Sequence, residues 1–289
     1  MKPFTKPALS LPDQISLLQS RGLEISDPSR ATRYLQFIGY YRLMAYARPY
    51  QVLADEEHTF LEGTTFDDLL DLYVFDRKLR LHTMDAIERL EVALRTVINN
   101  HMSLKYSQFW IMEKSLFLGS YKHDQLLRDL EKGTKNGSHP FCEAYYRKYD
   151  SPSLPPSWMV AEVLSLGQWS IIYANLAHTA DQKAVANTFK VPYSTLKSWL
   201  RSLSTLRNIC AHHGLVWNRK ITFPPSLASH FQAPSPNHYY ARAIVTWQLM
   251  GAITSHSSWL NTLKALLLTC PRPISEMGFP AGWQLLRGW

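Results

Sequence analysis

Hydrophobic residues recur at steps of three and four positions through most of this 289-residue chain, a spacing typical of helices that bury one face. The pattern is clearest in residues 66–106, which contain no proline or glycine. We predict one long helix there, with Thr64 and Thr65 as candidate caps and acidic residues in the first turn. Its buried stripe is predicted to consist of Leu69, Tyr73, Leu79, Met84, Ile87, Leu90, Leu94 and Ile98.

The first 63 residues show shorter segments. Pro12 and the pair Asp27-Pro28 are suitable helix starts, so two short helices are expected. Residues 37–51 are rich in tyrosine and in side chains that favour strands, and with residues 58–63 they could form a small hairpin or extended pair. We therefore predict that residues 1–63 form a small N-terminal elaboration of helices and a β-hairpin.

Residues 64–289 are predicted to form one helical domain, with a mixed connector inserted at residues 105–156 and the whole chain packed as one compact unit. Helical periodicity returns at residues 157–176, within 181–213 and at 238–269. Strands and helices do not alternate, and no GxxxxGK[ST] loop is present, which argues against a P-loop enzyme. The predicted fold class is therefore all-α.

Composition narrows the class of protein further. Hydrophobic residues make up 46% of the chain and charged residues 19%, which excludes a disordered chain. The longest apolar stretch lies within residues 243–253, too short for a membrane span, so no membrane association is expected. The three cysteines are far apart and form no CxxC pair, which argues against a disulfide framework or a thiolate zinc site. We expect a cytoplasmic protein.

The net charge of +8 makes a polyanionic partner plausible, because lysine and arginine side chains release counterions when they meet phosphates. The basic residues are scattered rather than clustered, so charge alone does not decide between a nucleic-acid binder and an ordinary basic protein. The tyrosines of residues 34–50 are open to the same two readings, because tyrosine can stack on bases or pack half-buried in a core.

The densest group of chemically versatile side chains lies in LRNICAHHGLVWNR, residues 206–219. No HExxH pattern or other set of ligands accompanies the two histidines, so we predict no metal site. A GxSxG nucleophile elbow is also missing. Arg207 and His212 are left as the groups able to carry chemistry. A similar pair, Arg77 and His82, lies within the long helix and is interpreted as coincidental, on a solvated face.

Helical geometry separates the roles of these side chains. Asn208 and His212 are four residues apart and share a face, so Asn208 could hold the imidazole, whereas Arg207 points about 140° away from His212. Imidazole moves protons near neutral pH, and a guanidinium can grip phosphate oxygens through two hydrogen bonds, a pairing suited to RNA cleavage without a metal. The alternative is that these cations merely cap a helix C-terminus. Chemistry alone leaves both interpretations open.

Glu91 and Arg95 lie beside the apolar stripe of the long helix. They are four residues apart and can pair with each other. Such a pair is either a structural ion pair or part of a polar site, and spacing alone favours the structural interpretation.

The hexapeptide Arg207-Asn208-Ile209-Cys210-Ala211-His212 matches the RNxxxH form of the motif of HEPN ribonucleases. Its surroundings resemble the bacterial abortive-infection family related to AbiD and AbiF. Further blocks resemble that family in the same order, namely YLQFIGYYRLMAYARPY, GTTFDDLLDLYVFDRKLRLHTMDAIERLEVALRT, PPSWMVAEVLSLGQWSIIYANL and MGFPAGW. The resemblance covers about residues 10–285 and relates the chain to the ancestors of the HEPN domains in type VI CRISPR effectors.

This resemblance implies a HEPN-type helical bundle and a metal-independent endoribonuclease that acts as a toxin or effector in phage defence. HEPN ribonucleases use two facing motifs, so the single copy here implies a homodimer with a composite site. Arg207 and His212 become the expected catalytic pair and Asn208 the orienting residue. Some members pair with a structured small non-coding RNA, which is the implied partner beside the RNA substrate, and no cofactor is expected.

Other residues are weaker candidates. We expect Glu91, Arg95, His213 and Asn218 to support the cleft and Tyr40, Tyr41, Arg42, Trp217 and Arg219 to bind RNA. Two other functions compete with the ribonuclease: an RNA-binding HEPN protein held inactive by its small RNA, and a purely structural helical protein.

Overall fold

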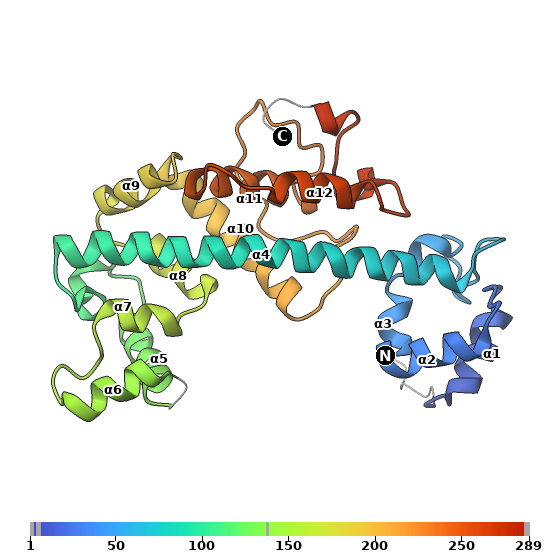
Figure 1. Cartoon of the computed structure of the whole chain (residues 1–289), viewed down its shortest axis with the longest axis horizontal. Coiled ribbons are helices and arrows are strands. Elements are labelled where there is room, and N and C mark those ends of the chain that lie inside the picture. The colour runs from blue at the N-terminus through green and yellow to red at the C-terminus, as the bar shows by residue number, and fades with distance from the viewer. Residues whose placement is uncertain (1–2, 4–6, 137–138, 286–289) are drawn as a thin grey trace. The chain divides into compact units, whose positions relative to one another are not determined.

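The computed structural model describes residue 3 and residues 7–136 and 139–285. The chain is all-α, as predicted, and pairing of extended backbone in the described residues is limited to isolated bridges (Figure 1). The α-helices are α1 (Leu11–Ser20), α2 (Pro28–Ile38), α3 (Tyr40–Met44), α4 (Phe66–Lys105), α5 (His123–Lys135), α6 (Pro140–Lys148), α7 (Ser157–Val160), α8 (Leu166–Ala174), α9 (Thr179–Thr188), α10 (Tyr193–Ala211), α11 (Tyr239–Ile253) and α12 (Trp259–Leu267). Short 3-10 turns are η1 (Arg48–Tyr50), η2 (Trp110–Met112), η3 (Lys114–Leu116), η4 (Ala161–Val163), η5 (Ile274–Met277) and η6 (Trp283–Leu285).

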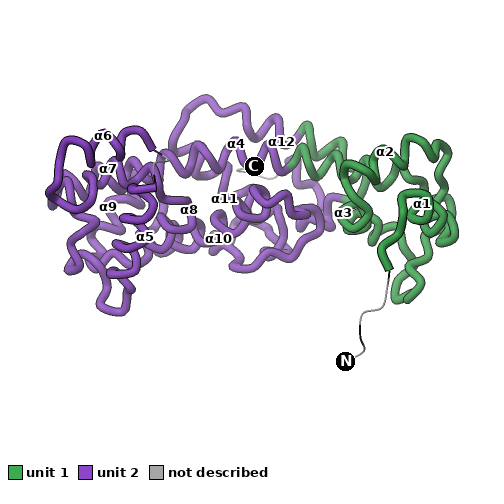
Figure 2. The backbone as a smooth tube through the Cα atoms, turned by 90° about the horizontal axis from the view of Figure 1, so that it is seen from below, with its two compact units in different colours: residues 1–79, 265–273 green, residues 80–264, 274–289 purple. Residues whose placement is uncertain are grey.

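The chain groups into two compact units, shown in different colours in Figure 2. Unit 1 consists of residues 1–79 with 265–273, and unit 2 consists of residues 80–264 with 274–289. The division therefore falls within α4 and α12, whereas the sequence placed it between residues 63 and 64, ahead of the long helix.

The two helices predicted at the start of unit 1 are confirmed, and each begins with a side-chain cap. The Asp27 carboxylate accepts a hydrogen bond from the Arg30 N–H at 2.9 Å, and Ser10 caps α1 in the same way, with a proline following in each case. Helix α2 ends at Gly39, whose positive φ of 86° favours glycine.

The β-hairpin predicted for residues 37–51 is wrong over most of its length. Residues 40–50 form α3 and η1, and the pairing with residues 58–63 reduces to one antiparallel bridge between Gln51 and Phe60. The reason is the spacing of the buried side chains, which is helical. They are Leu43, Tyr46, Ala47 and Tyr50. This period overrides the preference of tyrosine for strands.

Helix α4 confirms the predicted long helix. The Thr65 hydroxyl accepts a hydrogen bond from the Asp68 N–H at 3.2 Å, and the Asp68 carboxylate accepts one from the Thr65 N–H at 2.8 Å, so the helix start is capped in both directions. Of the predicted stripe, Tyr73 and Met84 are half-buried and the other members are buried.

Helix α10 forms the centre of unit 2, where it packs against α8, α9 and α11. Its apolar stripe, which consists of Trp199, Leu203, Leu206 and Cys210, is buried. Gly167 lets α8 come close to α10, since a β-carbon there would lie 3.0 Å from the Ser204 hydroxyl oxygen. The C-terminal end of α10 is therefore held by its packing on three neighbouring helices.

A buried arginine on α11 organises the segment that follows α10. The Arg242 side chain is fully buried and donates hydrogen bonds to backbone carbonyl oxygens of Pro236, His238, Ile221, Thr222 and Phe223 at 2.6–3.2 Å. Burial lowers the pKa of Arg242 to about 10, which leaves the guanidinium charged at neutral pH. The cation is thus stabilised by carbonyl dipoles that converge from both ends of residues 221–238.

Candidate active site

The Arg-Asn-x-x-x-His motif lies at the C-terminal end of α10. Arg207 and Asn208 are on the last turns of the helix, which ends at Ala211, so His212 is the first residue beyond it. The His212 N–H donates to the Asn208 carbonyl at 3.0 Å, and the Gly214 N–H donates to the Ile209 carbonyl at 2.7 Å. His213 between them has a positive φ of 57°. A left-handed residue of this kind closes a helix and turns the chain away.

The turn after His212 is fixed to α4. Arg80 is buried, and its Nη1 donates to the Gly214 carbonyl at 3.3 Å. Sequence reasoning missed this residue because no local pattern marks a contact across 134 residues. Arg80 is a candidate for positioning the turn rather than for touching a ligand.

Gly214 has little space for a side chain. A β-carbon at Gly214 would lie 3.1 Å from Ile209 Cγ2 and 3.2 Å from the Ile209 carbonyl oxygen, which is part of the helix backbone. We therefore expect Gly214→Ala to lower the free energy of unfolding by about 1 kcal/mol, as overpacking does, measured by urea denaturation.

Gly251 supplies the matched control for that substitution. It lies in α11, and a β-carbon there would have no neighbour within 4 Å. Alanine at this helical position is expected to stabilise the protein by about 0.5 kcal/mol. Equal effects of the two substitutions would contradict the crowding at Gly214.

Arg207 has an acidic neighbour from α4. Its Nε lies 3.8 Å from Glu91 Oε2, and the two side chains are 31% and 15% exposed. The same Nε is buried and has no hydrogen-bond partner among the described residues. Nη1 donates a long hydrogen bond of 3.5 Å to the Asn208 side-chain oxygen. The guanidinium is thus held by charge beside Glu91, while the Arg207 side chain as a whole stays partly exposed.

Glu91 lies where α4 meets the start of α8, and a backbone hydrogen bond from Leu166, the first residue of α8, reaches its carboxylate. Burial raises the pKa of Glu91 above the usual range of glutamate. Arg207 and the Leu166 N–H favour the carboxylate and offset only part of this effect. Three helices therefore meet at the ion pair that orients Arg207.

This raised pKa predicts a pH dependence of stability. The folded chain keeps the Glu91 proton to a higher pH than the unfolded chain, so the contribution of Glu91 to stability falls as pH rises from the ordinary glutamate range of about 4.3. We expect the free energy of unfolding of the wild type to fall relative to Glu91→Gln over this window. Urea titrations at about pH 4 to 7 check this, with Glu131→Gln on the surface of α5 as control. Parallel curves for wild type and Glu91→Gln would contradict it.

The predicted pair between Glu91 and Arg95 does not form. Arg95 Nη2 lies 2.7 Å from Glu162 Oε2 in η4, and Glu91 faces Arg207 instead. Each of the two residues is thus paired with a residue from another element, and not with the residue four positions away on α4. The structure therefore places Glu91 beside the motif, and places Arg95 in an ion pair that joins α4 to η4.

The remaining candidates near the motif differ in accessibility. Asn208, His212, His213, Asn218 and Arg219 are all exposed. Trp217 is only 2% exposed, which argues against its prediction as an RNA contact because a buried indole cannot stack on a base. Trp217 was predicted to bind RNA because of its residue type and its position beside the motif. In the structure, its ring packs into the core of unit 2.

Two further interpretations change with the structure. The histidine of the second Arg–His pair, His82, is half-buried, stacks on the Trp259 ring at 5.2 Å and contacts the Trp259 carbonyl at 2.9 Å, so it does not lie on a solvated face. Tyr40, Tyr41 and Arg42 belong to α3 in unit 1, away in the chain from the motif in unit 2.

Comparison with known protein families identifies the family of this chain. A family model described as Abi-like protein matches residues 33–218, which include Glu91, Arg207 and His212. The chain belongs to the Abi-like protein family. Membership in this abortive-infection family associates the Abi-like chain with defence against phage. Neither the curated proteins nor the solved structures contain a match to this chain.

The described residues contain neither a membrane-spanning helix nor a cluster of metal ligands. No helix there is both long and apolar enough to cross a membrane. No group of three or more histidine, cysteine, aspartate or glutamate side chains in those residues comes together in a way that could hold a metal ion.

Proposed function

We propose that this Abi-like protein is a HEPN endoribonuclease that cleaves RNA without a metal during phage defence. The observation that supports this best is the state of the motif at the end of α10. His212 is exposed, and Arg207 is held beside Glu91 with its side chain partly exposed. A proton-transfer group and an anion-binding group thus lie within one short stretch.

The chemistry assigned to these groups is an internal transfer at phosphorus. The 2′-oxygen of a ribose attacks the adjacent phosphate, its proton leaves to an imidazole, and the 5′-oxygen departs with a proton supplied by an imidazole. The products are a 2′,3′-cyclic phosphate and a 5′-hydroxyl. His212 serves the proton transfers. Arg207 stabilises the charge that develops on the phosphate oxygens. Glu91 positions Arg207.

A second copy of the chain is part of this proposal. Five residues along a helix amount to about 140° of rotation, so Arg207 and His212 of one chain do not face the same point. The side chain of Glu91 is 15% exposed and limits how far Arg207 can swing. Two copies related by a two-fold axis would bring an arginine and a histidine from each chain to one phosphate. Light scattering after size exclusion should give twice the chain mass.

The implied RNA partner is also proposed, on the strength of the charge. A net charge of +8 favours a polyanion, and a structured small non-coding RNA would hold the protein in check or direct it. The ratio of absorbance at 260 and 280 nm of the purified protein tests for such an RNA. A ratio typical of protein alone would count against a bound RNA.

The ribonuclease assignment is tested with end-labelled RNA and the full chain in EDTA. We expect cleavage to persist in EDTA and to leave 2′,3′-cyclic phosphate ends. Loss of cleavage on chelation would point to a metal-dependent reaction instead. Expression in cells gives a second readout, because Arg207→Ala and His212→Ala should relieve growth arrest.

A further inference from the structure

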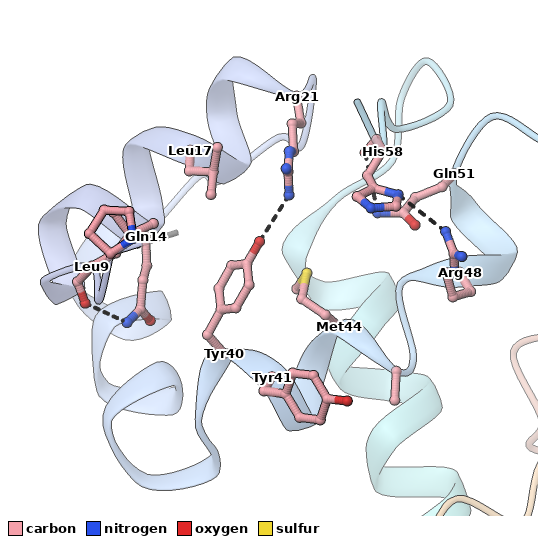
Figure 3. A pocket seen from close by; sticks show the side chains of 12 residues that line it. Leu9, Gln14, Leu17, Arg21, Tyr40, Tyr41, Met44, Arg48, Gln51 and His58 are labelled. Carbon is pink, nitrogen blue, oxygen red and sulfur yellow. Dashed lines mark hydrogen bonds between the residues drawn. The ribbon is translucent and has the colours of Figure 1, made fainter. Parts of the chain in front are cut away.

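A hollow of about 710 Å³ in unit 1 lies among α1, α3, η1 and residue 58 (Figure 3). Every residue that lines it belongs to unit 1. They are Pro7, Leu9, Gln14, Leu17, Arg21, Tyr40, Tyr41, Met44, Ala45, Arg48, Gln51 and His58. The volume lies within the range of about 300–1,000 Å³ that small-ligand sites occupy.

The lining carries positive charge without acidic residues. Arg21 Nη1 donates to the Tyr40 hydroxyl at 3.0 Å, and Arg48 Nη1 lies 3.2 Å from His58 Nδ1 (Figure 3). A guanidinium cannot accept a hydrogen bond, so His58 Nδ1 is the acceptor of that contact. Both arginines thus contact side chains other than carboxylates. Arg30 differs, since it forms an ion pair with Asp67.

Acidic residues flank the lining residues along the chain, among them Asp13, Glu24 and Asp55, but none of them lines the hollow. Asp55 accepts hydrogen bonds from the backbone N–H groups of Glu57 at 3.1 Å and Thr59 at 2.7 Å, so its carboxylate serves its own loop. Arg21 and Arg48 therefore contribute two positive charges to one hollow. This arrangement suits an anion such as a phosphate, whose oxygens each accept hydrogen bonds.

The tyrosines that line the hollow are suited to stacking on a planar aromatic ring. The Tyr41 side chain at the rim is 94% exposed, and Tyr40 is half-buried beside Met44 (Figure 3). Exposed tyrosine faces near a cationic groove stack on the bases of single strands. The Gln14 side-chain oxygen is buried and has no hydrogen-bond partner in the described residues, while its nitrogen donates to the Leu9 carbonyl. Gln14 thus belongs to the wall of the hollow.

We propose that this hollow binds one nucleotide of a single-stranded RNA. Tyr41 stacks on the base, and Arg21 and Arg48 hold the adjoining phosphates. The choice of RNA as the ligand rests on the proposed function. That the site binds an aromatic ring together with phosphate groups is inferred from the residues of unit 1 alone. The site is separate from the motif of α10 and would hold RNA before or during its cleavage.

The test measures binding rather than cleavage. The full chain and its variants are titrated into a fluorescein-labelled 2′-O-methyl oligonucleotide, which lacks the attacking hydroxyl and stays intact. We expect Tyr41→Ala and Arg48→Gln each to weaken binding about fivefold or more. Arg48→Gln should in addition reduce the salt dependence of binding. Tyr41 is almost fully exposed, so its variant should keep the wild-type melting temperature.

Matched controls come from unit 2. Tyr149→Ala removes a half-exposed tyrosine, and Arg128→Gln removes an exposed arginine on α5. Both should bind as the wild type does. If the controls weaken binding as much as the hollow variants, or if the hollow variants bind like the wild type, the proposed site is wrong.

The outcomes also separate this site from the ribonuclease. Cleavage with unchanged binding by Tyr41→Ala and Arg48→Gln would overturn the site and leave the ribonuclease standing. Weakened binding without any cleavage by the wild type would support the site and overturn the ribonuclease. A phosphotyrosine peptide that displaces the oligonucleotide at lower concentration than a mononucleotide would identify a protein ligand and overturn the assignment to RNA.

Discussion

His212→Ala is expected to lower the rate of RNA cleavage by about a thousandfold, because general acid–base groups contribute about 10² to 10⁴. The residue lies beyond the last turn of α10 and is exposed, so its loss leaves no cavity. The variant should therefore keep the wild-type melting temperature and RNA affinity. Initial rates on end-labelled RNA at saturating concentration measure the effect on the chemical step.

Arg207 supplies the companion to this prediction. Arg207→Lys keeps the positive charge but loses the planar fork, so we expect a loss of about tenfold or more even though the lysine could still pair with Glu91. His256→Ala, an exposed histidine outside the motif, should cleave as the wild type does. Folded His212→Ala and Arg207→Ala variants that cleave at the wild-type rate and still arrest growth would overturn the ribonuclease.

Arg242→Met is expected to lower the free energy of unfolding by about 3 kcal/mol. Five backbone carbonyls now share one guanidinium, and each buried carbonyl left without a donor costs about 1–3 kcal/mol unless water reaches it. Arg242→Lys should also destabilise the protein, since an ammonium has only three donors. Urea denaturation followed by tryptophan fluorescence measures both variants.

The control for Arg242 is an arginine whose side chain donates to an exposed neighbour on its own helix, the Gln125 side chain, at 2.7 Å. Arg128 is exposed on α5, and Arg128→Met should change stability by no more than about 0.5 kcal/mol. A loss below about 1 kcal/mol for Arg242→Met would show that these carbonyls find other donors. The indole N–H of Trp199 also donates to the Ser226 carbonyl at 2.7 Å, so the segment has a second attachment, to α10, that survives the substitution.

Helices with a repeated apolar spacing, or with a clear capping residue and proline at the start, could be predicted from the sequence, whereas residues 40–50 could not. Helix α4 and the stripe of α10 follow directly from spacing, because many positions repeat the same period. Residues 40–50 were misassigned because tyrosine favours strands, yet Leu43, Tyr46 and Ala47 are buried at helical spacing. Burial of side chains that share one helical face therefore outweighs the preference of single residue types for strands.

The candidate site shows the same limit. The motif itself lies within one helix end and could be found from residues alone. The partner of Arg207 could not, because the Glu91–Arg95 spacing within α4 suggested a local pair. Only the tertiary packing within unit 2 brings Glu91 to Arg207. Trp217 was assigned to RNA because its type suits stacking, and its burial depends on contacts that no local pattern records.

The position of Glu91 has a consequence for shortened forms of this chain. A fragment that began after residue 91 would still carry the complete Arg-Asn-x-x-x-His motif on α10. It would nevertheless lack the carboxylate beside Arg207, and also Arg80, which fixes the Gly214 carbonyl. The intact hexapeptide in a truncated gene product is therefore no guarantee of an oriented guanidinium.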